Sequence, residues 1–201
     1  MNDTRREKIA PFIKGLWEIL DGNDLGTLAE LRRLDDDRLA TALAGRVGWL
    51  LPPHLNRQEE DAYLLVARLF ATVRSGARSS GEDLGKVLGH LAGERGETPD
   101  RSDKGLERRV VALLSADLED LPERLTRVLA LARNSASVAH LDWAALLADV
   151  LSWESPSQFV QRHWARNFVN TRRPTKSEGG SEEFAGSNNR ESDNLQEGVL
   201  A

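Results

Sequence analysis

The chain has 201 residues, a formal net charge of −5 at pH 7 and no cysteine. Without cysteine, disulfides, thiolate metal sites and thiol nucleophiles are excluded. No apolar run approaches the roughly 20 residues that span a bilayer, and the N-terminal residues MNDTRR precede no apolar stretch like that of a signal peptide. We therefore expect a soluble, cytoplasmic protein with one domain, or with two small domains that share a core.

The balance of charged residues changes little along the chain. Residues 1–100 carry 14 Lys and Arg against 17 Asp and Glu, residues 101–170 carry 9 of each, and residues 171–201 carry 4 against 6. Because no segment is basic as a block, a surface for nucleic acid has to be a stripe of spaced side chains. Arginine outnumbers lysine 22 to 5, which suits bidentate phosphate contacts, but a coding bias toward Ala, Leu and Arg gives the same ratio.

Helical periodicity dominates the N-terminal half, and alternating strand patterns are absent. Five helices are expected there, over 5–20, 25–34, 35–50, 58–73 and 83–91. The run Asp35-Asp36-Asp37 stands at the start of the third. Its carboxylates favour the free amides and the dipole of a helix start, which explains the run better than a magnesium site does.

Helix-start signals continue in the second half. Asp120 with Glu123 and Ser155 with Gln158 have the spacing of capping boxes. A proline follows Asp120 by two positions and Ser155 by one, which is a favoured place for proline in the first turn. Asp142 is expected to cap the next helix, which is apolar.

The stretch 92–102, AGERGETPDRS, has two glycines, one proline and little apolar content, and predicts a linker. From residue 171 the chain is rich in Ser, Glu, Gly and Asn and too poor in apolar residues to fold. We therefore expect an all-α fold of two small helical bundles with a tail. The boundaries are 1–91 for the N-terminal bundle, 92–102 for the linker, 103–170 for the C-terminal bundle and 171–201 for a disordered tail.

The last predicted helix carries two ridges of side chains at i, i+4 and i+8. One is apolar and should be buried: Val160, Trp164 and Phe168. The other, Gln158, Arg162 and Arg166, lies on another face and has no acidic partner one turn away. Phosphate is one natural counterion for such an arginine pair, and a solvated polar face is the alternative. All five tryptophans have apolar neighbours at helical spacing, so we expect them in the core rather than stacked on bases.

The sequence lacks the patterns of an enzyme or a metalloprotein. The segment from Gly81 to Lys86 has three residues between its glycines where a phosphate-binding loop needs four, and Val87 stands where that loop has Ser or Thr. No G-x-S-x-G motif is present. The histidines fall in separate segments without metal-ligand spacing: His54, His90, His140 and His163. We expect no enzymatic activity, no cofactor and no metal.

A series of short motifs follows in an order that resembles a known family. The motifs are LRR at 31–33, LGK at 84–86, ERR at 107–109 leading into ALLSA at 112–116, LTR at 125–127, LDW at 141–143, DVLSW at 149–153 and RHWARNF at 162–168. Over roughly residues 10–169 the series resembles the small subunit of the type I-E CRISPR Cascade surveillance complex, the CasB family. The segment 74–78 is shorter than the family's usual segment there, and at 125–127 only Arg127 is carried over.

The resemblance implies an all-helical, non-catalytic subunit. In that family two copies stack head to tail against the backbone subunits that hold the guide RNA, and they help to hold the displaced non-target DNA strand. The partners implied are the guide CRISPR RNA, the displaced strand of the target DNA, the backbone and large subunits of Cascade, and a second copy of the chain.

The residues expected to contact nucleic acid, through phosphates and without reading sequence, are spaced cations: Arg32, Arg33, Lys86, Arg108, Arg109, Arg127, Arg162 and Arg166. The alternative is a helical protein–protein adaptor without nucleic-acid contact. A continuous face of these cations would favour nucleic acid, whereas pairing of each with a nearby carboxylate would favour the adaptor.

Overall fold

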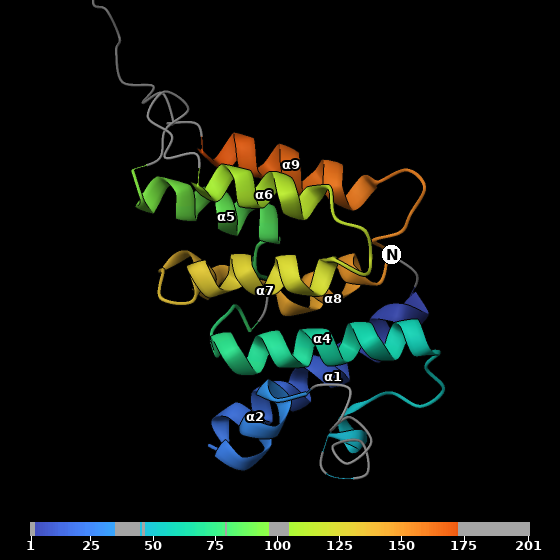
Figure 1. Ribbon diagram of the computed structural model, residues 1–201. Helices are drawn as coiled ribbons and strands as arrows, with labels where there is room; N and C mark the ends of the chain where they lie inside the picture. Colours follow the sequence, from blue (N-terminus) through green and yellow to red (C-terminus); the bar gives the residue numbers. More distant parts are fainter. Residues whose placement is uncertain (1–2, 35–44, 46, 79, 97–104, 173–201) are drawn as a thin grey trace, which may run out of the picture.

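The computed structural model describes residues 3–34, 45, 47–78, 80–96 and 105–172 (Figure 1). Within these ranges the regular elements are helices, and the β-type pairings are two isolated bridges. The helices are α1 (Asp3–Asp21), α2 (Leu25–Arg32), η1 (Gly48–Leu50), α4 (Arg57–Val73), α5 (Leu84–Glu94), α6 (Gly105–Leu114), α7 (Leu121–Ala132), η2 (Ser137–His140), α8 (Trp143–Val150) and α9 (Phe159–Arg172). The expected all-α fold is confirmed. None of these described helices is long and apolar enough to cross a bilayer.

The helices lie in three layers (Figure 1). Helices α5, α6 and α9 form one layer, α7 and α8 lie in the middle, and α1, α2 and α4 form the third. Helix α5 therefore packs against α9 from the far end of the described chain, and α4 packs against both α7 and α8. One cluster of buried apolar side chains includes residues from both sides of 92–102. The division into two bundles at that segment stays a prediction, since 97–104 lie outside the described residues.

Three aromatic rings connect α1, α4 and α8 in the core. Phe70 of α4 meets Trp17 of α1 and Trp143 of α8 edge to face, with ring centroids 4.9 and 5.4 Å away. The indole Nε1 of Trp143 donates to the carbonyl oxygen of Ser75 at 2.8 Å, so this fully buried ring has a partner for its polar atom.

The burial expected for the tryptophans is confirmed for four of the five. Trp17, Trp143, Trp153 and Trp164 are all buried. The prediction is wrong for Trp49, whose exposed fraction is 60%. Trp49 lies on the short helix η1, where the following residue, Leu50, takes the buried position instead.

Helices α5 and α9 approach most closely where α5 carries glycine. A Cβ at Gly85 would lie 2.4 Å from the carbonyl oxygen of Trp164. A Cβ at Gly89 would lie 3.0 Å from the carbonyl oxygen of Phe168 and 2.7 Å from Cβ of Thr171. Only residues without a Cβ let two backbones lie this close. The contact buries the apolar ridge of α9 that the sequence predicts, which ends at Phe168.

The helix starts agree only in part with the caps predicted from the sequence. Asp142 caps α8, since its Oδ1 accepts from two backbone amides of the first turn at 2.9 and 3.0 Å. Asp120 stands at the N-cap of α7 but makes no side-chain cap bond. The expected box at Ser155 is wrong. Gln158 has a left-handed φ of 49° and its amide bonds the carbonyl of Ser155 at 2.8 Å, so that α9 begins only at Phe159.

Two expectations fall largely outside the described residues. The helix start at 35–37 lies wholly outside them. Of the tail expected at 171–201, the first two residues complete α9, and 173–201 lie outside the described part of the chain.

We predict that Gly85→Ala destabilises the fold, because its Cβ has no room against the backbone of α9. Overpacking of this kind costs about 1–3 kcal/mol. Gly93→Ala is the matched control on the same helix. A Cβ at Gly93 meets nothing within 4 Å, and alanine there should stabilise the chain by about 0.5–1 kcal/mol. Chemical denaturation of both variants measures the difference, and equal free energies of unfolding would contradict the prediction.

Candidate nucleic-acid interface

The eight cations expected to contact phosphates are all exposed but lie on different layers (Figure 1). Arg32 and Arg33 stand at the end of α2, and Arg127 lies on α7. The other five belong to the layer of α5, α6 and α9: Lys86, Arg108, Arg109, Arg162 and Arg166. The structure therefore brings five of the predicted residues into one layer and leaves three apart from it.

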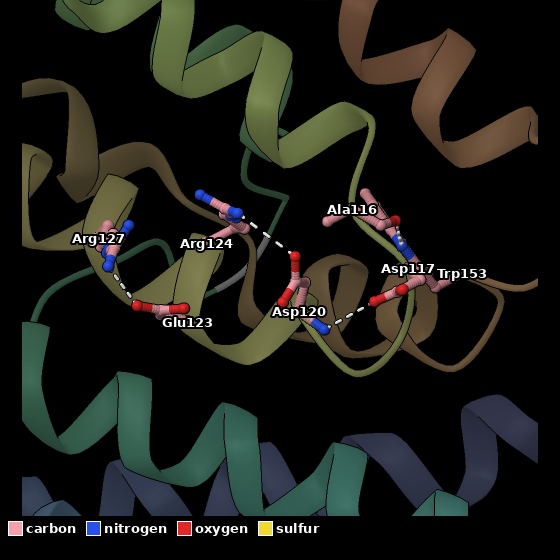
Figure 2. A network of polar contacts seen from close by, with 7 residues as sticks. All are labelled: Ala116, Asp117, Asp120, Glu123, Arg124, Arg127 and Trp153. Atoms are coloured by element: carbon pink, nitrogen blue, oxygen red, sulfur yellow. Dashed lines mark hydrogen bonds and ion pairs between the residues drawn. The ribbon is translucent and has the colours of Figure 1, made fainter.

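Arg127 has a carboxylate partner one turn away on its own helix. Its guanidinium contacts Glu123, and the neighbouring Arg124 pairs with Asp120 at 3.3 Å (Figure 2). Pairs of this kind at the surface contribute little to stability, but they reduce the positive charge of α7. Of the eight predicted phosphate contacts, Arg127 therefore fits the alternative better: a solvated surface whose charges are paired within the chain.

Arg32 and Arg109 contact backbone rather than carboxylates. Nε of Arg32 donates to the carbonyl oxygen of Leu28, and Nη1 of Arg109 donates to that of Gly105, both at 3.2 Å. Each acceptor is four residues earlier on the chain. These contacts hold the side chains along their helices, and no carboxylate of the described residues is found against either guanidinium group, so both residues keep the capacity to bind phosphate.

The exposed face of α9 carries an aromatic ring followed by cations. Phe159, Arg162, His163 and Arg166 stand at i, i+3, i+4 and i+7, a spacing that places them on one face, and all four are exposed. We call these four residues the α9 stripe. With Asp149 they line a pocket of about 540 Å³. No hydrogen bond or ion pair of either arginine side chain is found within the described residues.

Phe159 is the functional candidate that the sequence reasoning missed. The expected ridge combines Arg162 and Arg166 with Gln158, but Gln158 lies before the helix, in the left-handed turn. Shifting the helix start to the residue after that turn brings Phe159 into register with the two arginines. The sequence does contain the i, i+3 and i+7 spacing of Phe159, Arg162 and Arg166. It does not reveal the left-handed turn at Gln158, which makes Phe159 the first residue of the helix.

Polar contacts with α5 fix one side of the stripe. Nδ2 of Asn167 donates to Oδ2 of Asp83 at 2.7 Å and lies 3.1 Å from Nε2 of His163. The same His163 nitrogen is 3.6 Å from Oδ2 of Asp83. Asp83 also caps α5, since Oδ1 accepts from the amide of Lys86 at 3.2 Å. One carboxylate therefore joins the start of α5 to the middle of α9 and orients His163.

Asp149 of α8 supplies the carboxylate in the pocket of the stripe. Its Oδ2 accepts from Nε1 of Trp164 at 2.7 Å. Burial raises the pKa of Asp149 from 3.8 to about 6, against the opposing effects of the Trp164 hydrogen bond and of His163. The carboxylates of Asp83 and Asp142 raise this pKa further. The surroundings thus disfavour the charge that Asp149 carries near neutral pH.

A second pocket, of about 990 Å³, is lined mainly by acidic side chains. It lies between the start of α4, the connection from α6 to α7 and the end of α8. Its charged lining is five carboxylates against one arginine: Glu59, Asp61, Asp117, Glu119, Glu154 and Arg57. Such a field repels phosphate, so this pocket does not suit nucleic acid.

Potential metal ligands are dispersed. The part of the chain that the structure describes contains no group of three or more His, Asp or Glu side chains that could hold a metal ion. The histidines lie on separate elements, and His90 has a carboxylate neighbour, Glu82, at 3.2 Å.

Comparison with known proteins identifies the family of this helical chain. A family model described as CRISPR-associated protein Cse2 matches residues 27–168. The chain belongs to the Cse2 family. A curated member, the CRISPR-associated protein Cse2 of Thermus thermophilus, is 35% identical over 113 residues, which are 56% of this chain and 59% of the relative. The aligned part thus spans less than two thirds of that relative's length.

Solved structures share the fold of this Cse2-family chain. The crystal structure of CasB from M. ruber matches with a TM-score of 0.54 and 30% identity, over 73% of this chain and 85% of that chain. A chain of a CRISPR RNA-guided surveillance complex matches with a TM-score of 0.64 and 22% identity, over 84% of this chain and 94% of that chain. The resemblance found in the sequence motifs is confirmed at the level of the family.

We predict that Asp149→Asn removes a pH-dependent loss of stability. The folded-state pKa of about 6 lies above the ordinary 3.8, so the stabilising contribution of the bound proton is present below about pH 4 and is lost as the pH rises through 6. The full effect is at most about 3 kcal/mol. Asparagine keeps an acceptor for Nε1 of Trp164 without the charge.

Urea unfolding between about pH 5 and 8 checks this prediction. The stability advantage of Asp149→Asn over the unchanged chain should grow with pH. A difference that stays constant across the range would contradict the raised pKa.

Proposed function

We propose that the chain is the non-catalytic small subunit of a CRISPR RNA-guided surveillance complex of the Cascade type, and that it holds the displaced non-target DNA strand. Its family and its shared fold with a chain of such a complex support the assembly. The observation that carries the strand-holding role is the exposed pair Arg162 and Arg166, which has no carboxylate contact within the described residues. Its partners in the cytoplasm would be the guide RNA, the target DNA, other Cascade subunits and a second copy of the chain.

The chemistry of this role is phosphate neutralisation. Arg162 and Arg166 stand one helical turn apart on a helix that packs against α5, so two guanidinium groups that can each bind phosphate through paired N–H donors start from neighbouring points on one face. Lys86 on α5 and Arg108 and Arg109 on α6 are further exposed cations on the helices of the same layer. Phosphate contacts position a strand without reading its bases, and guide pairing reads the sequence. Holding the displaced strand would stabilise the R-loop by opposing re-annealing of the DNA duplex.

A helical protein–protein adaptor without nucleic-acid contact is the second candidate, and one region favours it. On α7, Arg127 is paired with Glu123 and Arg124 with Asp120 (Figure 2). The carboxylate-lined pocket that includes Asp117 lies beside the start of this helix. These features suit contact with a protein partner better than contact with nucleic acid.

We predict that Arg162→Gln with Arg166→Gln weakens capture of the displaced strand and reduces its salt dependence. Each phosphate contact with a single strand contributes about −0.7 to the slope of log affinity against log salt. Loss of two contacts should flatten the slope by about 1.4, equally for unrelated strand sequences. Arg108→Ala with Arg109→Ala should flatten it by about 1 to 1.4. Target binding by the reconstituted complex across a salt series is the measurement.

The matched control is Arg124→Gln with Arg127→Gln, which removes the same charge from arginines that already have carboxylate partners. Its slope should stay that of the unchanged complex. Normal assembly with an unchanged slope in every arginine variant would reject the strand-holding role and favour the adaptor.

A further inference from the structure

The ring of Phe159 is half exposed although it stands on an ordered helix. Its exposed fraction is 50%, whereas the apolar ridge of the same helix, at Val160, Trp164 and Phe168, is 1–5% exposed. Exposed apolar area contributes nothing to the hydrophobic stabilisation of the chain. Packing among the described residues therefore covers only about half of this side chain.

The pocket beside this ring has the size and the chemistry of a small-ligand site. Its volume of about 540 Å³ falls within the about 300–1,000 Å³ typical of such pockets. Asp149 is engaged by Nε1 of Trp164, and His163 is held toward Asp83. Of the charged groups that line the pocket, Arg162 and Arg166 are the cations for which no partner is found among the described residues, and the hydroxyl of Ser157 also lines it.

We propose that this pocket holds one nucleotide of single-stranded DNA, with its base against the ring of Phe159 and its phosphates on Arg162 and Arg166. The proposal rests on the proposed strand-holding function and adds a base contact to it. Base stacking on an aromatic ring tolerates any sequence, because every base has a π-face. The site therefore fits a strand that the complex must hold whatever its sequence.

The combination of ring and cations favours a nucleotide over other anions. A free phosphate would use the arginines and leave the ring of Phe159 in water. An acidic peptide would also satisfy the arginines without presenting a planar base. A nucleotide places an apolar plane and a phosphate within one residue of the strand, which matches the i, i+3 and i+7 spacing of Phe159, Arg162 and Arg166 on one helix face.

The test compares binding of the full chain to a thymidine homopolymer and to an abasic DNA strand of equal length and charge, by fluorescence anisotropy across a salt series. The unchanged chain should bind the thymidine strand about 5- to 150-fold more tightly, the range expected for one stacked base. Phe159→Ala should remove that preference and keep the salt slope, and Phe159→Trp should keep both. The ring is half exposed, so these changes should not unfold the chain.

Two further variants separate stacking from charge. Arg162→Gln with Arg166→Gln should keep the preference for bases and flatten the slope by about 1.4. Trp49→Ala is the matched aromatic control, since Trp49 is 60% exposed but lies on η1, and it should change neither quantity. If Trp49→Ala lost as much of the preference for the thymidine strand as Phe159→Ala, the stacking would be unspecific and the proposal would be overturned.

The remaining outcomes distinguish the nucleotide pocket from the strand-holding function. Equal binding of thymidine and abasic strands, with full salt dependence, would reject the nucleotide pocket and leave the strand-holding function intact. Binding of neither strand by the isolated chain at about 50 mM salt would reject the nucleotide pocket, and the salt series of the reconstituted complex would then decide the strand-holding function. A uridine RNA strand of the same length identifies the source of the nucleotide: tighter binding of DNA supports the displaced strand, and equal or tighter binding of RNA overturns that assignment.

Discussion

The close approach of α5 and α9 is the constraint on which the candidate site depends. At Gly85 the backbone of Trp164 lies too close to leave room for a Cβ, so this contact allows little change in the register of the two helices. That register buries Trp164, directs its Nε1 to Asp149 and leaves the α9 stripe facing solvent. Arg172 of α9 pairs with Glu107 of α6 at 3.1 Å, which ties the third helix of the layer to the same unit. The helix that carries the site is therefore packed on its buried face against both α5 and α6.

Local patterns predicted the features that depend on one helix at a time. The apolar ridge beginning at Val160 follows from helical spacing, and the cap at Asp142 from residue type. The role of Gly85 could not be predicted in that way, because it depends on which distant helix packs there. The start of α9 was misplaced because the left-handed turn at Gln158 arises from a single backbone conformation that capping patterns do not encode, and so Phe159 was missed.

The cations show the same division between local and tertiary information. The pairing of Arg127 with Glu123 is an i, i+4 relation that can be found in the sequence, although the sequence reasoning grouped Arg127 with the phosphate contacts. The separation of Arg32 from the α5–α6–α9 layer depends on the packing of α2 against α4, which no spacing reveals. The structure thus places five of the eight exposed cations on the helices of one layer and the other three on other elements.

The charge of the whole chain bears on how such a layer would work. A net charge of −5 and a pocket lined by five carboxylates oppose unspecific capture of duplex DNA by the isolated chain. A few phosphate contacts then hold a strand weakly, and more weakly still as salt rises. If the strand is delivered by guide pairing beside the subunit, its effective concentration is high and weak contacts suffice. On the proposed function, a sparse cationic surface on an acidic protein would make strand holding conditional on prior target recognition, which a strongly basic subunit would not achieve.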